Sequence, residues 1–305
     1  MNIDRIIQGD CIEAMKTIPD GIVDTCVTSP PYFGLRDYGV DGQIGLEDTP
    51  DEYVERLVDV FREVKRILKD DGTLWLNIGD SYAGNCSRTS AGRAGMGAER
   101  DGIFIRGGKG LKPKDLIGIP WRVAFALQAD GWYLRQDIIW HKPNPMPESV
   151  TDRCTKSHEY IFLFSKSQKY YFNNEAIKEE AETKPSIRDK NAEGYACDYA
   201  KGDRFSKGAR VYGEDGLRNK RDVWTVPVKP FTEAHFATFP EELIKPCILA
   251  GSRESGIVFD PFMGAGTTAY VAKKLGRHYL GSELNQEYIT IANNRLNSIE
   301  ESLFL

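Results

Sequence analysis

The sequence lacks the patterns of a membrane, secreted or metal-bound protein. No apolar run approaches the length of a membrane span, and the chain begins in a strand-like segment, so we expect no membrane association and no signal peptide. The four histidines lack the spacing of metal ligands, and no CxxC pair occurs among the six cysteines at positions 11, 26, 86, 154, 197 and 247. We therefore expect no metal, no disulfide framework and a reducing, cytoplasmic setting.

Basic residues are in a minority, which disfavours a polyanionic partner on net charge alone, since the chain carries a net charge of −5. Their distribution is uneven. Residues 83–115 hold seven Lys or Arg against three acids, and residues 184–221 hold ten against six. A chain that is acidic overall can still bind nucleic acid through such local concentrations of positive charge.

The two common phosphate-binding signatures are also absent, since there is neither a GxGxxG motif nor a Walker lysine. A different glycine turn is present. Asp260-Pro-Phe-Met-Gly-Ala-Gly-Thr-Thr268 follows a strand pattern and begins a helix, which lets backbone N–H groups approach a ligand. Glu283 ends the next strand, where related folds hold ribose hydroxyls, and Asp10 ends another strand, placed to accept from an adenine amine.

A second turn follows the buried strand pattern of residues 22–28. In Thr28-Ser29-Pro30-Pro31-Tyr32 the two prolines end the strand, fix two φ angles and leave carbonyls without neighbouring N–H partners. A hydroxyl, free carbonyls and an aromatic ring are thereby presented together. Such a set suits a flat ring that bears an amino group, because the oxygens accept from the NH2 and Tyr32 stacks on the ring.

Strand and helix patterns alternate along most of the chain, which predicts an α/β fold with a mostly parallel sheet. Thr49 and Pro50 should begin a helix that runs to Leu68, with residues 70–72 ending it before a strand at 73–78. Near the end of the chain, a helix with Pro240 at its first position should run to Leu249.

The two turns, in this order, resemble those of S-adenosylmethionine-dependent DNA amino-methyltransferases whose catalytic motif precedes the cofactor motif. Further stretches match the family: Gly9-Asp10, residues 140–147, 158–160 and 239–243, and Gly281-Ser282-Glu283. The resemblance implies a Rossmann-like α/β methyltransferase fold with a mixed seven-stranded sheet in permuted order. It also implies S-adenosylmethionine as cofactor, held by a set of residues that comprises Asp10, Phe239, Asp260, Phe262, Gly264, Gly266, Thr267, Thr268 and Glu283.

The chemistry that follows from the resemblance is direct transfer of a methyl group to an exocyclic amine of a flipped base. Ser29 and the Pro30 carbonyl would accept the amine hydrogens, Pro31 would keep the turn rigid, and Tyr32 would stack on the base. Ser29 as the first residue of the motif favours the N4 amine of cytosine over the N6 amine of adenine, the main alternative.

Three divisions of the chain are expected. Residues 1–174 would form the catalytic half, with a mobile basic loop at 83–115; residues 175–225 a target-recognition insertion; and residues 226–305 the cofactor half. DNA contacts are expected from the loop and the insertion, at Arg88, Arg93, Arg100, Arg106, Lys109, Lys207 and Arg210. Double-stranded DNA is thus the expected partner, with a companion restriction endonuclease possible and a monomer or homodimer as the assembly.

Other functions remain open on the sequence. Methylation at carbon 5 of cytosine needs a cysteine nucleophile, and Pro246-Cys247 fits superficially, although its apolar neighbours favour a buried helical cysteine. A methyltransferase acting on RNA or on a protein amide can share a similar turn. A non-catalytic DNA-binding module is the remaining alternative, and the intact motifs at 29–32 and 264–266 argue against it.

Overall fold

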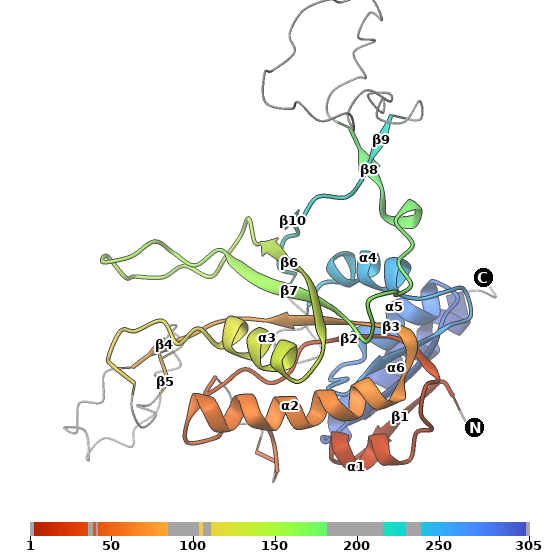
Figure 1. The fold of residues 1–305 in the computed structure, drawn as a ribbon, viewed down its shortest axis with the longest axis horizontal. Coiled ribbons are helices and arrows are strands. Elements are labelled where there is room, and N and C mark those ends of the chain that lie inside the picture. Colours follow the sequence, from red (N-terminus) through yellow and green to blue (C-terminus); the bar gives the residue numbers. More distant parts are fainter. Residues whose placement is uncertain are drawn as a thin grey trace, which may run out of the picture.

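The computed structural model describes residues 3–35, 39–40, 42–84, 104–105, 111–181, 216–229 and 239–302. Its centre is an eight-stranded sheet in the order β1-β12-β11-β2-β3-β7-β6-β10, with α1, α2 and α3 on one face and α4, α5 and α6 on the other (Figure 1). No described helix is long and apolar enough to cross a membrane.

The strands of this sheet are β1 (Arg5–Gln8), β2 (Val23–Thr28), β3 (Leu68–Ile78), β6 (Tyr133–His141), β7 (His158–Ser165), β10 (Val223–Thr225), β11 (Ile257–Asp260) and β12 (His278–Glu283). The helices are α1 (Cys11–Lys16), α2 (Pro50–Ile67), α3 (Ile119–Ala129), α4 (Glu241–Gly251), α5 (Thr267–Lys274) and α6 (Gln286–Ser302), with a 3-10 turn, η1 (Glu175–Ile177). Two short pairs lie outside the main sheet: β4 (Tyr82–Ala83) with β5 (Phe104–Ile105), and β8 (Glu179–Glu180) with β9 (Leu217–Arg218).

The main sheet confirms the expected mixed α/β architecture, since only β7 runs against the other strands. It has one strand more than the seven we expected. The extra strand, β10, is the edge strand of the sheet and pairs in parallel with β6, and the Trp224 ring lies 6.5 Å from that of Trp75. Three residues inside a polar segment give no periodic signal, so the sequence did not reveal this strand.

Helix α2 begins as expected and ends differently. The Thr49 side chain accepts from the Glu52 N–H while Glu52 bonds back to the Thr49 N–H, which forms a capping box ahead of Pro50. Residues 70–72 do not form the expected turn, because β3 starts directly at Leu68, and its pairing with β2 jumps from Leu68 to Thr73 across a bulge. At α4, Pro240 is the extended N-cap instead of the first helical residue.

Buried apolar side chains fill both faces of the sheet. The α1–α3 face encloses large residues such as Tyr53, Phe61 and Phe162, and the α4–α6 face encloses Trp75 and Ile248. All six residues of β2 are buried, as expected for a parallel strand that is covered on both sides. The central strands are thereby fixed, and they carry both predicted motifs.

The first and last strands lie side by side, because β1 pairs in parallel with β12. The N-terminal and C-terminal parts of the chain therefore meet at β1–β12 and again at β2–β11, the pair of strands that leads into the two predicted motifs. Helix α2, after β2, lies on one face, whereas α5, after β11, lies on the other (Figure 1). The connections diverge here, and open α/β sheets bind ligands at such a switch point, beyond the carboxyl ends of the strands.

Candidate active site

Four residues predicted to bind the cofactor or the target base lie along the side of the sheet where the parallel strands end. Asp10, Ser29, Asp260 and Glu283 each lie at or just after the carboxyl end of a parallel strand, β1, β2, β11 and β12 respectively. These four strands are neighbours in the sheet, in the order β1-β12-β11-β2. The fold therefore brings the catalytic turn and the cofactor turn together, although they are more than 200 residues apart in the chain.

Asp260 joins the two turns. One of its carboxylate oxygens accepts from the Thr28 hydroxyl at 2.6 Å and from the Phe262 N–H at 3.0 Å, and the other accepts from the Thr268 hydroxyl at 2.7 Å. Asp260 is 1% exposed, and this burial raises the pKa of its carboxyl to about 7, although the three hydrogen bonds act in the opposite direction. Because both oxygens are occupied, the side chain positions the turns.

Gly264 and Gly266 both have positive φ angles but differ in their surroundings. At Gly264 (φ 53°) an added Cβ would meet only the Phe262 carbonyl oxygen, at 3.9 Å, so its backbone is accessible to a ligand. At Gly266 (φ 78°) an added Cβ would lie 2.6 Å from the Cβ of Ala292 in α6. Gly266 therefore serves helix packing, which is a role that the sequence did not indicate.

Glu283 faces the cofactor turn from the end of β12. Its carboxylate accepts from the Gly264 N–H at 2.7 Å and from the Asn285 N–H at 2.9 Å. Burial raises the pKa of Glu283, and the backbone hydrogen bonds partly oppose that shift. The side chain is half-buried, so an acceptor remains at the border between the turn and solvent.

Asp10 lies one strand further along the edge, as the N-cap of α1. One carboxylate oxygen accepts from the N–H groups of Ile12 and Glu13, and the other lies 3.5 Å from an Arg56 guanidinium nitrogen. Within the described part of the chain, the second oxygen has only this long contact, so it can accept from an amine. The Gly9 N–H bonds to the Glu283 carbonyl, which places Asp10 beside the cofactor turn.

Four predicted cofactor residues remain. The side chains of Thr267 and Thr268 face the protein core, and the rings of Phe239 and Phe262 lie at the border of the core. The Thr268 hydroxyl is committed to Asp260, and the buried Thr267 hydroxyl accepts from Arg295 at 3.1 Å. Phe262 and Phe239 are partly buried against the two cores. Only the backbone of the two threonines, in the first turn of α5, remains a candidate cofactor contact.

These features fit S-adenosylmethionine. No side chain caps the N-terminus of α5, so its first N–H groups can face a carboxylate such as that of the methionine portion. Gly264 leaves room at the backbone, Glu283 has oxygens that could accept from ribose hydroxyls, and Asp10 has one that could accept from an amine. Among the described residues, no group of His, Cys, Asp and Glu could hold a metal ion.

The catalytic turn is held from α2 and from the segment that follows the turn. The Tyr53 hydroxyl donates to the Pro31 carbonyl at 2.8 Å, and Gly45 packs against the same proline, where an added Cβ would lie 3.1 Å from the Tyr32 carbonyl oxygen. The Pro31 carbonyl is thereby used, whereas no described residue donates to that of Pro30. Ser29 is half-buried beside it.

Tyr32 is anchored by residues for which the sequence indicated no role. Its hydroxyl donates to Glu159, at the start of β7, at 2.7 Å and lies 3.4 Å from Asn77 at the end of β3. Burial, followed by the Glu159 charge, raises the pKa of Tyr32 well above its usual value, and a hydrogen bond with Ser29 partly offsets this. A polar residue at each strand end was the available signal, but the pairing of β3 with β7 was needed to read it.

Cys247 does not fit a nucleophile. It is 1% exposed within α4, burial raises the pKa of its thiol, and its Sγ contacts the Leu243 carbonyl. The structure thus supports a buried helical cysteine and excludes it as a carbon-5 nucleophile. The predicted DNA contacts Arg88, Arg93, Arg100, Arg106, Lys109, Lys207 and Arg210 lie outside the described residues.

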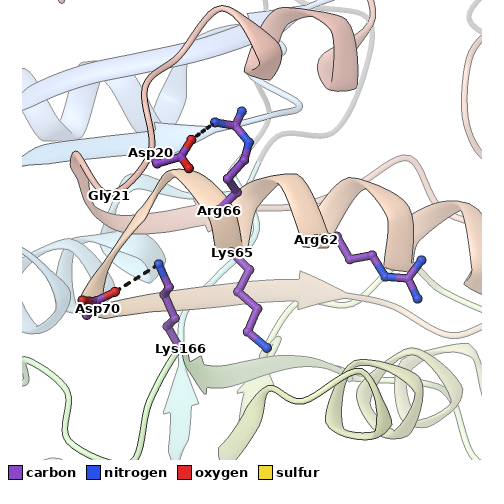
Figure 2. A pocket seen from close by; sticks show the side chains of 7 residues that line it. All are labelled: Asp20, Gly21, Arg62, Lys65, Arg66, Asp70 and Lys166. Carbon is purple, nitrogen blue, oxygen red and sulfur yellow. Dashed lines mark hydrogen bonds and ion pairs between the residues drawn. The ribbon is translucent and has the colours of Figure 1, made fainter.

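A basic hollow of about 550 Å³ lies at the opposite edge of the sheet, near the start of β2 and β3 (Figure 2). Its cations include Arg66, which pairs with Asp20 and Glu63, and Lys166, which pairs with Asp70. Arg62 pairs with Asp59 and Asp130. Acids therefore neutralise much of its positive charge, and it lies away from both motifs.

Comparison with known proteins identifies the family of this chain. The family model described as DNA methylase matches residues 23–294. The chain is 48% identical over 296 residues to the Type II methyltransferase M.Cfr9I of Citrobacter freundii, covering 97% of this chain and 88% of that protein. It is 49% identical over 302 residues to the Type II methyltransferase M.SmaI of Serratia marcescens, covering 96% and 90%.

Solved structures share the fold. The PvuII DNA methyltransferase (cytosine-N4-specific) matches with a TM-score of 0.64 and 18% identity, over 96% of this chain and 90% of that one. A putative DNA modification methylase from Thermus thermophilus, complexed with S-adenosyl-L-methionine, matches with a TM-score of 0.62 and 25% identity, over 97% and 94%. This chain belongs to the DNA methylase family of S-adenosylmethionine-dependent amino-methyltransferases.

Proposed function

We propose that this DNA methyltransferase modifies the N4 amine of cytosine at a specific sequence. The observation that carries the proposal is the Thr28–Asp260 hydrogen bond, because it holds the Ser29 turn next to the cofactor turn. The structural match to a protein described as cytosine-N4-specific supports the choice of base. So does Ser29 in the first position of the motif, where adenine enzymes of the family usually carry Asp or Asn.

The residues around Ser29 suit the activation of an amine. An exocyclic amine is a weak nucleophile because its lone pair is delocalised into the ring. The Ser29 hydroxyl oxygen and the Pro30 carbonyl would accept its two hydrogens, which favours a pyramidal nitrogen whose lone pair is aimed at the methyl donor. S-adenosylmethionine supplies a methyl group bonded to a positively charged sulfur.

The transfer is direct, with no bond between enzyme and base. A nitrogen–carbon bond forms as the sulfur–carbon bond breaks, and the amine then releases a proton to solvent. A base paired inside a duplex cannot reach the turn, so the cytosine must be flipped out and stacked on Tyr32. The rigid turn, held at Pro31 by Tyr53, keeps the acceptors in place for this geometry.

DNA binding is assigned to the two basic segments. Arg88, Arg93, Arg100, Arg106 and Lys109 would contact phosphates from the 83–115 loop, and Lys207 and Arg210 would act in the 175–225 insertion, where bases are read. The stem of this insertion, at β8 and β9, is held by Glu179 with Arg218 and Arg221. A companion restriction endonuclease is part of the proposal, since the relatives are Type II methyltransferases.

Methylation of the N6 amine of adenine is the second candidate. It needs the same two acceptors, so the geometry of the turn does not distinguish the two bases.

The test is transfer of a labelled methyl group from S-adenosylmethionine to unmethylated DNA under single-turnover conditions. Ser29→Ala should lower the rate on the order of 10²- to 10³-fold, as expected when one preorganised hydrogen-bonding group is lost. Calorimetry should show unchanged cofactor binding, because Ser29 faces the base. Weakened cofactor binding with an unchanged transfer rate would reverse the assigned roles.

A further inference from the structure

Glu159 occupies the centre of a hydrogen-bonded cluster at the rim of the catalytic turn. Its Oε2 accepts from the Tyr32 hydroxyl at 2.7 Å and from Asn77 Nδ2 at 3.3 Å, and its Oε1 accepts from the Lys142 ammonium. Three elements thereby meet at one carboxylate: the turn after β2, the end of β3 and the segment after β6. Its side chain is only 15% exposed.

The Tyr32 ring also packs closely against the backbone of Gly79. An added Cβ at Gly79 would lie 2.7 Å from the ring and 3.3 Å from the Glu159 carboxyl carbon, so Gly79 is the backbone against which both side chains pack. Packing against Gly79 therefore limits rotation of the ring plane, and the hydrogen bond from the hydroxyl fixes the far end of the ring.

Lys142 keeps Glu159 in place. Its ammonium pairs with the carboxylate, is 18% exposed and lies 4.2 Å from the centre of the Trp140 ring. Asn77 is fixed as well, because its amide also donates to the Tyr160 carbonyl at 3.0 Å. A carboxylate held by two fixed partners gives the Tyr32 hydroxyl a well-defined acceptor at 2.7 Å, closer than Asn77 Oδ1 at 3.4 Å. Hydrogen bonds to charged groups are also the stronger ones.

We propose that Glu159 is a positioning residue for methyl transfer, which fixes the Tyr32 ring in the orientation that stacks on the flipped base. The inference rests on the proposed function, because stacking by Tyr32 is part of it. Glu159 acts through Tyr32 and touches neither cofactor nor methyl group. The loss of this carboxylate therefore affects the transfer step and leaves cofactor binding intact.

The experiment compares Glu159→Ala, Glu159→Gln and Tyr32→Phe with the double variant that carries Tyr32→Phe and Glu159→Ala. The substrate is a DNA duplex that contains the sequence methylated by the wild-type protein, identified by methylation-sensitive sequencing. Single-turnover rates are measured with cofactor affinity by calorimetry and melting temperature. A matched control, Glu63→Ala, removes another half-buried carboxylate that pairs with Arg66 near the opposite edge.

Glu159→Ala and Tyr32→Phe should each slow transfer about 10- to 100-fold, the range expected for a hydrogen bond to a charged group. The double variant should be no slower than the slower single variant, because both remove the same contact. Glu159→Gln should recover most of the rate, since an amide oxygen still accepts from Tyr32. Cofactor affinity should be unchanged in all variants, and Glu63→Ala should keep the wild-type rate.

Three results would overturn the inference. The rate losses of the two single variants could multiply in the double variant, Glu159→Ala could transfer at the wild-type rate, or Glu159→Ala and Glu159→Gln could lose the same factor in rate. If Glu159→Ala fails to fold, Glu159→Gln tests the inference by itself. A stably folded Glu159→Gln protein that transfers methyl groups as slowly as Tyr32→Phe would contradict the expected recovery of the rate. A wild-type protein that methylates no DNA would instead reject the proposed function. A failure of the inference about Glu159 can therefore be distinguished from a failure of the proposed function.

Discussion

Thr28 donates a 2.6 Å hydrogen bond to Asp260, which joins the last residue of β2 to the last residue of β11. The two residues are 232 positions apart. Both are at most 1% exposed, and the same carboxylate also accepts from Thr268 in the first turn of α5. One buried acid thereby sets the distance between the turn proposed to bind the target amine and the turn predicted to bind the cofactor.

The first prediction concerns Asp260 and pH. Burial raises the pKa of this carboxyl from 3.8 to about 7 in the folded protein, so the folded state holds its proton more tightly than the unfolded state. Its contribution to the free energy of unfolding is therefore fully present below about pH 4 and is lost as the pH rises through about 7. Asp260→Asn should flatten the fall in stability between about pH 4 and 7.

Urea denaturation at several pH values measures this slope, which is about 1.4 kcal/mol per pH unit for each proton released. Glu283 also has a raised pKa and adds a slope of the same sign. The difference between wild type and variant is thus the informative quantity. Equal slopes would show that Asp260 does not titrate in this range.

The second prediction concerns the cofactor turn. Gly264→Val should abolish S-adenosylmethionine binding, because it puts a branched side chain where backbone must approach the ligand, at a residue with φ 53°. The left-handed backbone alone should cost about 1–2 kcal/mol of stability. Isothermal calorimetry on the folded variant is the measurement, and undiminished binding would refute the assignment of this turn.

The third prediction separates Gly266 from Gly264. Gly266→Ala should lower the free energy of unfolding by about 2 kcal/mol or more, because the new Cβ would overlap Ala292 and the φ of 78° disfavours an L-residue. Thermal and urea unfolding measure the effect. A stable Gly266→Ala protein would mean that α6 moves freely away from the turn.

The fourth prediction concerns the basic loop. Neutralising Arg88, Arg93 and Arg100 should weaken binding to all DNA sequences alike and reduce the dependence of affinity on salt, because phosphate contacts release counterions. Replacement of residues 184–221 should instead change or abolish sequence preference. Fluorescence anisotropy at several salt concentrations checks both. An altered recognition sequence after loop neutralisation would contradict the division of roles.

Much of the fold followed from local signals. Apolar runs ending in Asp10, Ser29, Asp260 and Glu283 located four strands. Because the carboxyl ends of parallel strands lie along one side of a sheet, they also predicted that these four residues lie near one another, as the strand order shows. The short strand β10 could not be predicted from the sequence, because three residues carry no periodicity. The bulge in the pairing of β3 with β2 could not be predicted either, because it depends on how the two strands align.

Side-chain partners could not be read from the sequence in the same way. Asp260 was expected to bind cofactor, but its carboxylate bonds to Thr28 and Thr268, a fact that depends on how β2 lies against β11. Glu159 reaches Tyr32 only because β7 runs against β3 and brings its first residues to the catalytic edge. Contacts of this kind depend on strand order, which no local pattern contains.

The most direct test of the central claim is nucleoside mass spectrometry of DNA methylated by the purified protein. DNA free of prior modification is incubated with the protein and S-adenosylmethionine, digested to nucleosides and compared with the same reaction using Ser29→Ala. The proposed mechanism predicts N4-methylcytosine in the wild-type reaction and little or none with the variant. N6-methyladenine without N4-methylcytosine would contradict the assigned base, and 5-methylcytosine would contradict the amine mechanism itself.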